Sequence, residues 1–251
     1  ENELGRFSPR ELLLSDGAYS DEGLRTFARD RLGSCVEQGG EWRFVEESAR
    51  EAAEKQFPQQ TFAPEEELLV RAAGGLLSYL HETQKSELSY ISRLEVYGQS
   101  QYMELDYTAR RNLELTASLH GGEKKGSLLW VLDKTRTAMG ARLLRQWLEK
   151  PLLSVAAIER RQEAVAALAG DLMARESLEQ ALSGVNDMER IASRIVYGSA
   201  NGRDLRALWT VCQKLPDIRA GLEPFRAPLL RELLDKMDPL TDVGELIGSA
   251  I

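Results

Sequence analysis

A loop rich in glycine and lysine is the first segment whose composition could serve chemistry. Residues 121–127 read Gly-Gly-Glu-Lys-Lys-Gly-Ser. Backbone N–H groups of glycine-rich loops hold phosphate when the loop joins a strand to a helix. This segment matches neither GxxxxGK[ST] nor GxGxxG, and it lies between two helical patterns. We therefore favour a surface loop over a phosphate contact.

Carboxylates in the first part of the chain could hold divalent metal ions. Glu11, Asp16, Asp21 and Asp30 are the candidates. A two-metal nuclease needs its acidic ligands fixed together, as strand-borne carboxylates are, and none of these residues is centred in a predicted strand. We interpret them as solvated residues and helix caps. The sequence thus predicts no catalytic residue and no metal ligand.

Thiols and imidazoles are sparse and scattered. Cys35 and Cys212 form no CxxC pair, and His81 and His120 stand apart from them and from each other. A structural zinc site needs clustered ligands, and a catalytic triad needs a nucleophile with a base beside it. We expect two reduced thiols in a cytoplasmic protein, and no zinc site.

A basic pair flanked by acids is the most informative polar cluster. Arg110, Arg111 and Asn112 lie between Asp106 and Glu114, at a helix start that follows a short extended segment. Two interpretations stay open: an ion-pair and hydrogen-bond cluster at a junction between two domains, and direct contact with DNA. We favour the junction between domains.

Composition narrows the class of protein further. The 251 residues are 43% hydrophobic and 29% charged, as in an ordinary soluble globular protein. The net charge of -8 is unusual for a DNA-binding domain, because phosphate neutralisation supplies most of such affinity. We find no apolar run that could span a bilayer and no signal peptide. The chain lacks a starting Met, and its last residues continue an apolar helical pattern, so we expect a fragment.

The elements that must position these residues fall into two groups. The first 60 residues predict an open sheet covered by helices. A strand is expected at Glu11–Leu14, a helix at residues 21–32, a strand at residues 42–45, and a helix that Ser48 opens with a capping box. From Pro64 a helix of about 20 residues carries a wide apolar stripe. Its Gly74-Gly75 pair predicts close packing against another backbone.

The rest of the chain predicts helices almost throughout, after a short strand expected at residues 102–105. Arginines on these helices are expected to pair with glutamates on the same faces; they are Arg142, Arg145, Arg160 and Arg161, with Glu149, Glu159 and Glu163. Pro216 is expected to stop one helix. The expected N-terminal caps are Asp106 or Thr108, Ser127, Thr137, Ser154 and Asp187.

Several ordered segments resemble one known family. Residues 102–115 (YMELDYTARRNLEL), 126–144 (GSLLWVLDKTRTAMGARLL) and 145–152 (RQWLEKPL) are followed by DMER at 187–190, Arg194, and RDL at 203–205. Together they resemble signature segments of the MutS family of DNA mismatch-repair proteins. Gly202 stands where that family often has Pro before RDL. Residues 72–84 resemble the helix that ends the family's connector domain, and residues 1–60 match more loosely.

The resemblance implies a fold class and a domain plan. Residues 1–88 would be the C-terminal part of an α/β connector, an incomplete ribonuclease H-like fold without its catalytic carboxylates. Residues 89–251 would be an all-α lever or core domain, truncated before the clamp. The family's mismatch-reading and ATPase motifs would belong to parts of the parent outside this chain.

The resemblance also implies a function. The parent would be a cytoplasmic homodimer that binds mismatched double-stranded DNA, uses ATP and Mg, and recruits MutL. This chain would bind no cofactor, contact no membrane and catalyse nothing; it would transmit conformational change between the DNA clamp and the ATPase. Two alternatives remain: a ribonuclease H-like nuclease, and a helical interaction scaffold of a MutS paralogue.

Overall fold

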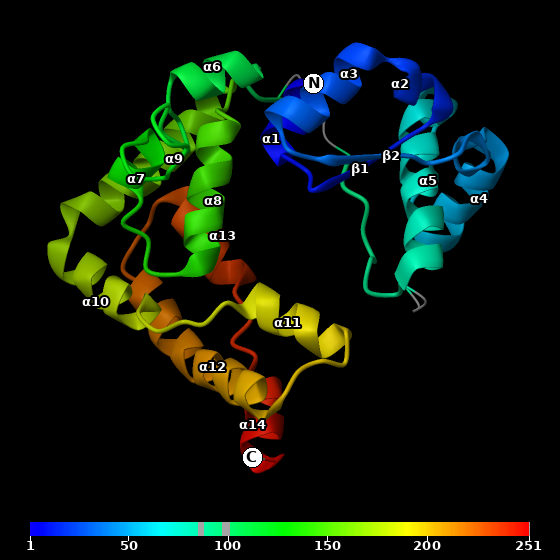
Figure 1. The fold of residues 1–251 in the computed structure, drawn as a ribbon. Coiled ribbons are helices and arrows are strands. Elements are labelled where there is room, and N and C mark those ends of the chain that lie inside the picture. Colours follow the sequence, from blue (N-terminus) through cyan, green and yellow to red (C-terminus); the bar gives the residue numbers. More distant parts are fainter. Residues whose placement is uncertain (85–87, 97–100, 251) are drawn as a thin grey trace. The chain divides into compact units, whose positions relative to one another are not determined.

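The computed structural model describes residues 1–84, 88–96 and 101–250 (Figure 1). The chain divides into two compact units, the N-terminal unit (Glu1–Tyr97) and the helical unit (Gly98–Ile251). We predicted a domain boundary after Leu88. Tyr90, Ile91 and Leu94, which follow it, pack against the core of the N-terminal unit.

A two-stranded parallel sheet lies in the N-terminal unit. Its strands are β1 (Glu11–Leu14), as predicted, and β2 (Cys35–Gln38). Leu14, Val36 and Ala28 are buried together beside it. The elements before β1 and between the strands are α1 (Asn2–Phe7), α2 (Asp16–Ser20), α3 (Glu22–Thr26) and the π-helical turn η1 (Phe27–Arg31).

The strand predicted at residues 42–45 is wrong. This segment is the 3-10 helix η2 (Glu41–Phe44), and the second strand, β2, ends before it. Gly40 explains the difference, because its φ of 73° lies in the left-handed region and turns the chain away from the sheet. Phe44 is consequently buried. Strand-forming residue types are here used for a tertiary contact rather than for pairing.

Close backbone packing joins the two long helices of this unit, as the glycine pair predicted. A Cβ atom at Gly74 would lie 2.4 Å from Ala49 Cα, and one at Gly75 would lie 2.5 Å from the Phe44 ring. Only glycine allows this approach. The two helices are α4 (Glu46–Gln56) and α5 (Glu67–Gln84), which lie side by side in Figure 1. The 3-10 turn η3 (Pro64–Glu66) directly precedes α5.

The capping box predicted at Ser48 is also wrong. Helix α4 begins at Glu46, and Val45 is its N-cap without a side-chain bond. Ser48 therefore lies inside the first turn, where its hydroxyl donates to the Val45 carbonyl at 3.1 Å. Serine bonds readily to such nearby carbonyl groups when a backbone N–H is not within its reach.

The helical unit follows the predicted caps closely. Asp106, Ser127, Thr137, Ser154 and Asp187 each accept a backbone N–H from the first turn of a helix. We did not predict α10. The helices are α6 (Tyr107–Asn112), α7 (Leu128–Leu132), α8 (Ala138–Glu149), α9 (Val155–Gly170), α10 (Leu172–Leu182), α11 (Met188–Val196), α12 (Gly202–Leu222), α13 (Pro228–Lys236) and α14 (Thr241–Ala250).

Pro216 does not stop its helix, contrary to our prediction. Helix α12 continues through it to Leu222. A proline inside a helix costs about 3 kcal/mol, because a hydrogen bond is lost and the ring crowds the preceding turn. Ile218 and Leu222, which follow Pro216, are both buried. Burying a side chain of this size contributes about 1.5–3 kcal/mol, so the two residues offset that cost.

The strand predicted at residues 102–105 is reduced to a single antiparallel bridge between Tyr102 and Leu152. The Met103 N–H donates to the Pro151 carbonyl at 2.8 Å beside it. The bridge fixes the beginning of the helical unit to the segment that follows α8.

None of the described helices combines the length and the apolar composition that a membrane-spanning helix needs.

Candidate functional site: polar contacts between the signature segments

The predicted junction residues lie in and around α6. Asp106 caps this helix, because its Oδ1 atom accepts the Ala109 N–H at 2.5 Å. Arg110 and Arg111 occupy the last turn, where the helix dipole favours a positive charge. Asn112 ends the helix. Arg110 is half-buried, whereas Arg111 and Asn112 are exposed. Their role between domains stays a prediction.

Glu114 organises the turn after α6. Its φ of 47° places it in the left-handed region, which is uncommon for a residue other than glycine. Its Oε1 atom accepts the Leu119 N–H at 2.6 Å, and its carbonyl oxygen accepts the Leu128 N–H at 2.9 Å. Glu114 therefore connects the end of α6 with both ends of the glycine-rich segment.

Polar contacts of Lys124 and Ser127 hold the glycine-rich loop against the segment around α7. Lys124 Nζ lies 2.5 Å from Asp133 Oδ2, and the Thr135 hydroxyl donates to Asp133 Oδ1 at 2.6 Å. These bonds, that from Lys124 foremost, lower the pKa of Asp133 to about 2. Ser127 is fully buried, donates to the Lys124 carbonyl and caps α7. Residues 121–126 are exposed, which confirms the predicted surface loop.

An arginine of α8 binds the beginning of α11. Arg142 donates two parallel hydrogen bonds to Asp187, at 2.7 and 2.8 Å, and a third to Glu189. Asp187 is at the same time the N-cap of α11. Hydrogen bonds from Arg142 are the largest cause that lowers the pKa of Asp187 to about 2. The arginine of the MGARLL segment thus pairs with both acids of the DMER segment.

A second arginine continues this contact to α12. Arg194 Nη1 lies 2.5 Å from Asp204 Oδ1. Asp204 is 8% exposed, and its other oxygen accepts the Asn201 N–H at 3.1 Å in the capping box of α12. The RDL aspartate therefore serves a helix cap and an ion pair together. We call the contacts of Arg142 and Arg194 the arginine relay.

The predicted pairing of other arginines is right at one position. Arg145 pairs with Glu149 one turn along α8, as expected, at 3.0 Å. Arg160 instead pairs with Glu232 of α13. Arg161 stacks 3.7 Å from the centre of the Trp147 ring, and burial lowers its pKa.

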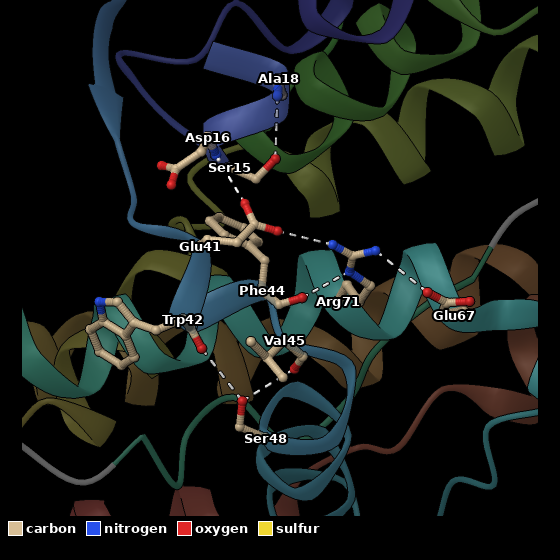
Figure 2. Close-up of polar contacts among 10 residues, drawn as sticks. All are labelled: Ser15, Asp16, Ala18, Glu41, Trp42, Phe44, Val45, Ser48, Glu67 and Arg71. Carbon is tan, nitrogen blue, oxygen red and sulfur yellow. Dashed lines mark hydrogen bonds and ion pairs between the residues drawn. The ribbon is translucent and has the colours of Figure 1, made fainter. Parts of the chain in front are cut away.

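The N-terminal unit has a comparable polar centre that sequence reasoning missed (Figure 2). Arg71 of α5 donates to the Phe44 carbonyl at 2.8 Å and pairs with Glu41 at 3.3 Å and Glu67 at 3.4 Å. Glu41 also accepts the Asp16 N–H at 3.2 Å. One arginine therefore connects α5 with η2, and Glu41 connects η2 with the beginning of α2. Only the Glu67–Arg71 spacing was visible in the sequence.

The carboxylates of the N-terminal unit that were candidate metal ligands lie on separate elements. Within residues 1–84, 88–96 and 101–250, no three His, Cys, Asp or Glu side chains are grouped so that they could hold a metal ion. Glu11, Asp16, Asp21 and Asp30 fall on β1, α2, the N-cap of α3 and η1. Asp21 is the cap of α3 that we expected among these carboxylates, since its Oδ1 atom accepts the Leu24 N–H.

The chain is thus of the class that joins a small α/β unit to a helical unit, and motif residues of the helical unit pair with one another. Two family models match this chain. The one described as MutS domain II matches residues 1–92, and the one described as MutS domain III matches residues 108–251. The chain belongs to the MutS family and carries its domains II and III.

Individual relatives agree with this assignment. A protein of Symbiobacterium thermophilum is 44% identical over 253 residues, which cover 99% of this chain. One of Alkaliphilus oremlandii is 40% identical over 260 residues and covers 100% of it. Both are named DNA mismatch repair protein MutS. The chain spans 29% of the length of each of these relatives.

Proposed function

We propose that this chain is a non-catalytic module that transmits conformational change between the DNA clamp and the ATPase of a mismatch-recognition protein. The arginine relay is the observation that carries the proposal. It joins α8 to α11 through Arg142 and α11 to α12 through Arg194. Motif residues that bind one another across helices are suited to coupling the positions of those helices.

The charge distribution supports a role away from direct DNA binding. The N-terminal unit holds 19 of the 40 acidic and 11 of the 32 basic residues, a net charge of -8, whereas the helical unit holds 21 of each. Neither unit has the excess of positive charge that phosphate binding uses. Many arginines of the helical unit are also engaged with carboxylates.

The proposal for the whole protein goes further. Both relatives are named for DNA mismatch repair. We propose that the parent binds mismatched double-stranded DNA as a homodimer in the cytoplasm, hydrolyses ATP with Mg, and recruits MutL. The ATP and Mg sites would lie outside this chain, which would then be no enzyme by itself.

The proposed ribonuclease H-like fold of the connector is supported by β1. Leu12 and Leu14 pack into the core with Val36, whereas Leu13 lies against Gly39 on the other face. A strand that is apolar on both faces is typical of the interior of a parallel sheet covered by helices on both sides. Strand β2 has three exposed residues of four, as an edge strand would.

The experiment uses the purified chain with a labelled duplex that contains one mispaired base, and with the matched duplex as control. We expect weak binding without preference between the two duplexes and no hydrolysis of ATP. We also expect no cleavage of the labelled duplex when Mg²⁺ is added. Tight binding selective for the mismatch would overturn the assignment as a transmission module. Metal-dependent cleavage would replace it with the nuclease alternative.

A further inference from the structure

Helices α8 and α12 are held in the helical unit by different kinds of contact. Helix α12 has six buried residues, among them Val211 and Leu215, whereas α8 has none. The largest apolar side chains of α8, such as Leu144 and Trp147, are only half-buried. Apolar burial therefore stabilises the position of α12 more than that of α8.

Charged groups make the contacts of α8 and of its N-terminal flank with α10 and α11. Arg142 binds Asp187 and Glu189 on α11, and Arg136, just before α8, binds Glu179 on α10 at 2.6 Å. The side chains of both arginines are about half exposed, at 48% and 55%. Ion pairs at such positions are screened by salt, whereas apolar burial is not.

The Arg142 contact is also specific in geometry. Its two parallel bonds need the Asp187 carboxylate in one place and one orientation. Asp187 has little freedom, because it caps α11. A shift of α11 by one residue along its axis, about 1.5 Å, would stretch bonds of this kind beyond hydrogen-bonding distance.

We propose that Arg142 is a positioning residue that acts as a releasable latch: its bonds to Asp187 and Glu189 hold α8 on α11 in one state and are broken in another. The inference rests on the proposed function, since a transmission module needs an element with two arrangements. The latch gives that role to α8 and leaves α12 as the fixed element.

Hydrogen exchange of the intact chain at low and high salt tests the latch. In the native chain, salt should raise exchange in α8 several-fold and leave the buried part of α12 unchanged. Arg142→Gln should raise α8 exchange at low salt and reduce its salt dependence to the part that the Arg136–Glu179 pair supplies. Arg142→Lys should fall between, because lysine keeps the charge without the paired bonds. Arg145→Gln is the matched control, since Arg145 pairs within α8.

Asp187→Asn checks the partner side of the latch. Asparagine still caps a helix but lacks the charge, so α11 should persist while α8 is released. The double variant with Arg142→Gln should exchange no faster than either single variant, because both remove one contact. Additive effects, native-like exchange in Arg142→Gln, or equal loosening of α8 and α12 would each overturn the latch.

The parent protein separates the two proposals. There, Arg142→Gln should leave ATP hydrolysis without DNA unchanged and reduce its response to a mismatched duplex, with Arg142→Lys partly restoring it. An unchanged response would overturn the latch as part of transmission even if α8 loosens. The proposed function fails by a different result, namely mismatch-selective binding by this chain alone.

Discussion

The N-terminal unit and the helical unit differ in their closest backbone contacts and in their balance of charge. In the N-terminal unit, α4 and α5 approach at glycines until their backbones touch, and the whole surplus of negative charge lies there. In the helical unit, charges balance, and helices far apart in sequence are joined by arginines. The first arrangement resists separation, whereas the second can be reversed by screening.

Charge averaged over the chain conceals this difference. A net charge of -8 suggests an acidic protein throughout, but the helical unit is neutral. The acidic composition of the N-terminal unit follows partly from its helix beginnings, since Glu46, Glu47 and Glu67 lie in first turns where the helix dipole favours them. We therefore expect the two units to be stabilised independently of each other and by these different means.

The largest expected effect is in the core around α12. Leu222→Ala should lower the free energy of unfolding of the helical unit by roughly 2–5 kcal/mol, because it removes a buried side chain and leaves a cavity. Leu222 packs with Ala164, Phe225, Leu230 and Leu234. Denaturant titration followed by hydrogen exchange in each unit measures it.

Leu246→Ala is the matched control, because Leu246 of α14 is 71% exposed. It should change stability by less than about 0.5 kcal/mol. The N-terminal unit should keep its own unfolding midpoint in both variants. A parallel loss of stability in the N-terminal unit would contradict the independence of the two units.

Gly74→Ala tests the backbone contact of the N-terminal unit. The added Cβ would lie 2.4 Å from Ala49 atoms of the main chain, which cannot move like a side chain. We expect a loss of about 1–3 kcal/mol, typical of overpacking. Gly170→Ala in α9 is the control, since no atom lies within 4 Å of its added Cβ. If both substitutions were tolerated alike, the helices would not be in close backbone contact.

Two serines give a smaller and more local comparison. Ser127→Ala should destabilise the helical unit by about 1–2 kcal/mol, because a buried cap and a hydrogen bond to Lys124 are both lost. Ser48→Ala should cost less than about 0.5 kcal/mol, because Ser48 is exposed and caps nothing. Thermal unfolding of the two variants distinguishes them. An equal cost at both positions would restore the capping box that the sequence suggested.

Helix caps are the features that sequence reasoning predicted best. A cap such as Thr137 or Ser154 depends on residues within one turn, so local sequence is enough to predict it. The predictions of a strand at residues 42–45 and of a helix end at Pro216 failed. A turn at Gly40 decides the first structure, and the burial of residues after the proline decides the second. Local propensity is a weak guide where such tertiary contacts act.

The candidate site was predictable in its parts and not in its pairing. The motifs named Arg142, Asp187, Arg194 and Asp204 in order, without indicating which arginine meets which acid. Arg142 and Asp187 are separated by 45 positions. The spacing rules for helix faces reach only three or four positions, so they grouped Arg142 with the helix-face glutamates Glu149, Glu159 and Glu163 and missed Asp187. The pair meets only because the tertiary fold brings α8 to the N-terminal end of α11, where Asp187 is the cap.

Acid should loosen the helical unit through Asp133 and Asp187. Each has its pKa lowered from 3.8 to about 2 by its cation. A carboxyl whose pKa is lower in the folded state contributes stability that is present above pH 4 and is lost as the pH falls towards 2. Protection from hydrogen exchange in α7 and α8 should therefore fall as the pH is lowered through that window. Asp187→Asn should remove the part of this pH dependence that α8 shows. A rise confined to the N-terminal unit would contradict this assignment.

Alkali should produce the smallest effect, in the N-terminal unit, through Tyr79. Its hydroxyl donates to Glu11 on β1, and this bond is the largest cause that raises the pKa of Tyr79 from 10.0 to about 12. A phenol whose pKa is higher in the folded state contributes stability that is full below pH 10 and is lost as the pH rises towards 12. Both groups are partly solvated, which limits the effect. Tyr79→Phe should therefore remove the loss of exchange protection that β1 and α5 show as the pH rises from 10 to 12. The loss of protection in the helical unit in acid should stay unchanged. If the Tyr79→Phe chain still loses protection between pH 10 and 12, another group causes that loss.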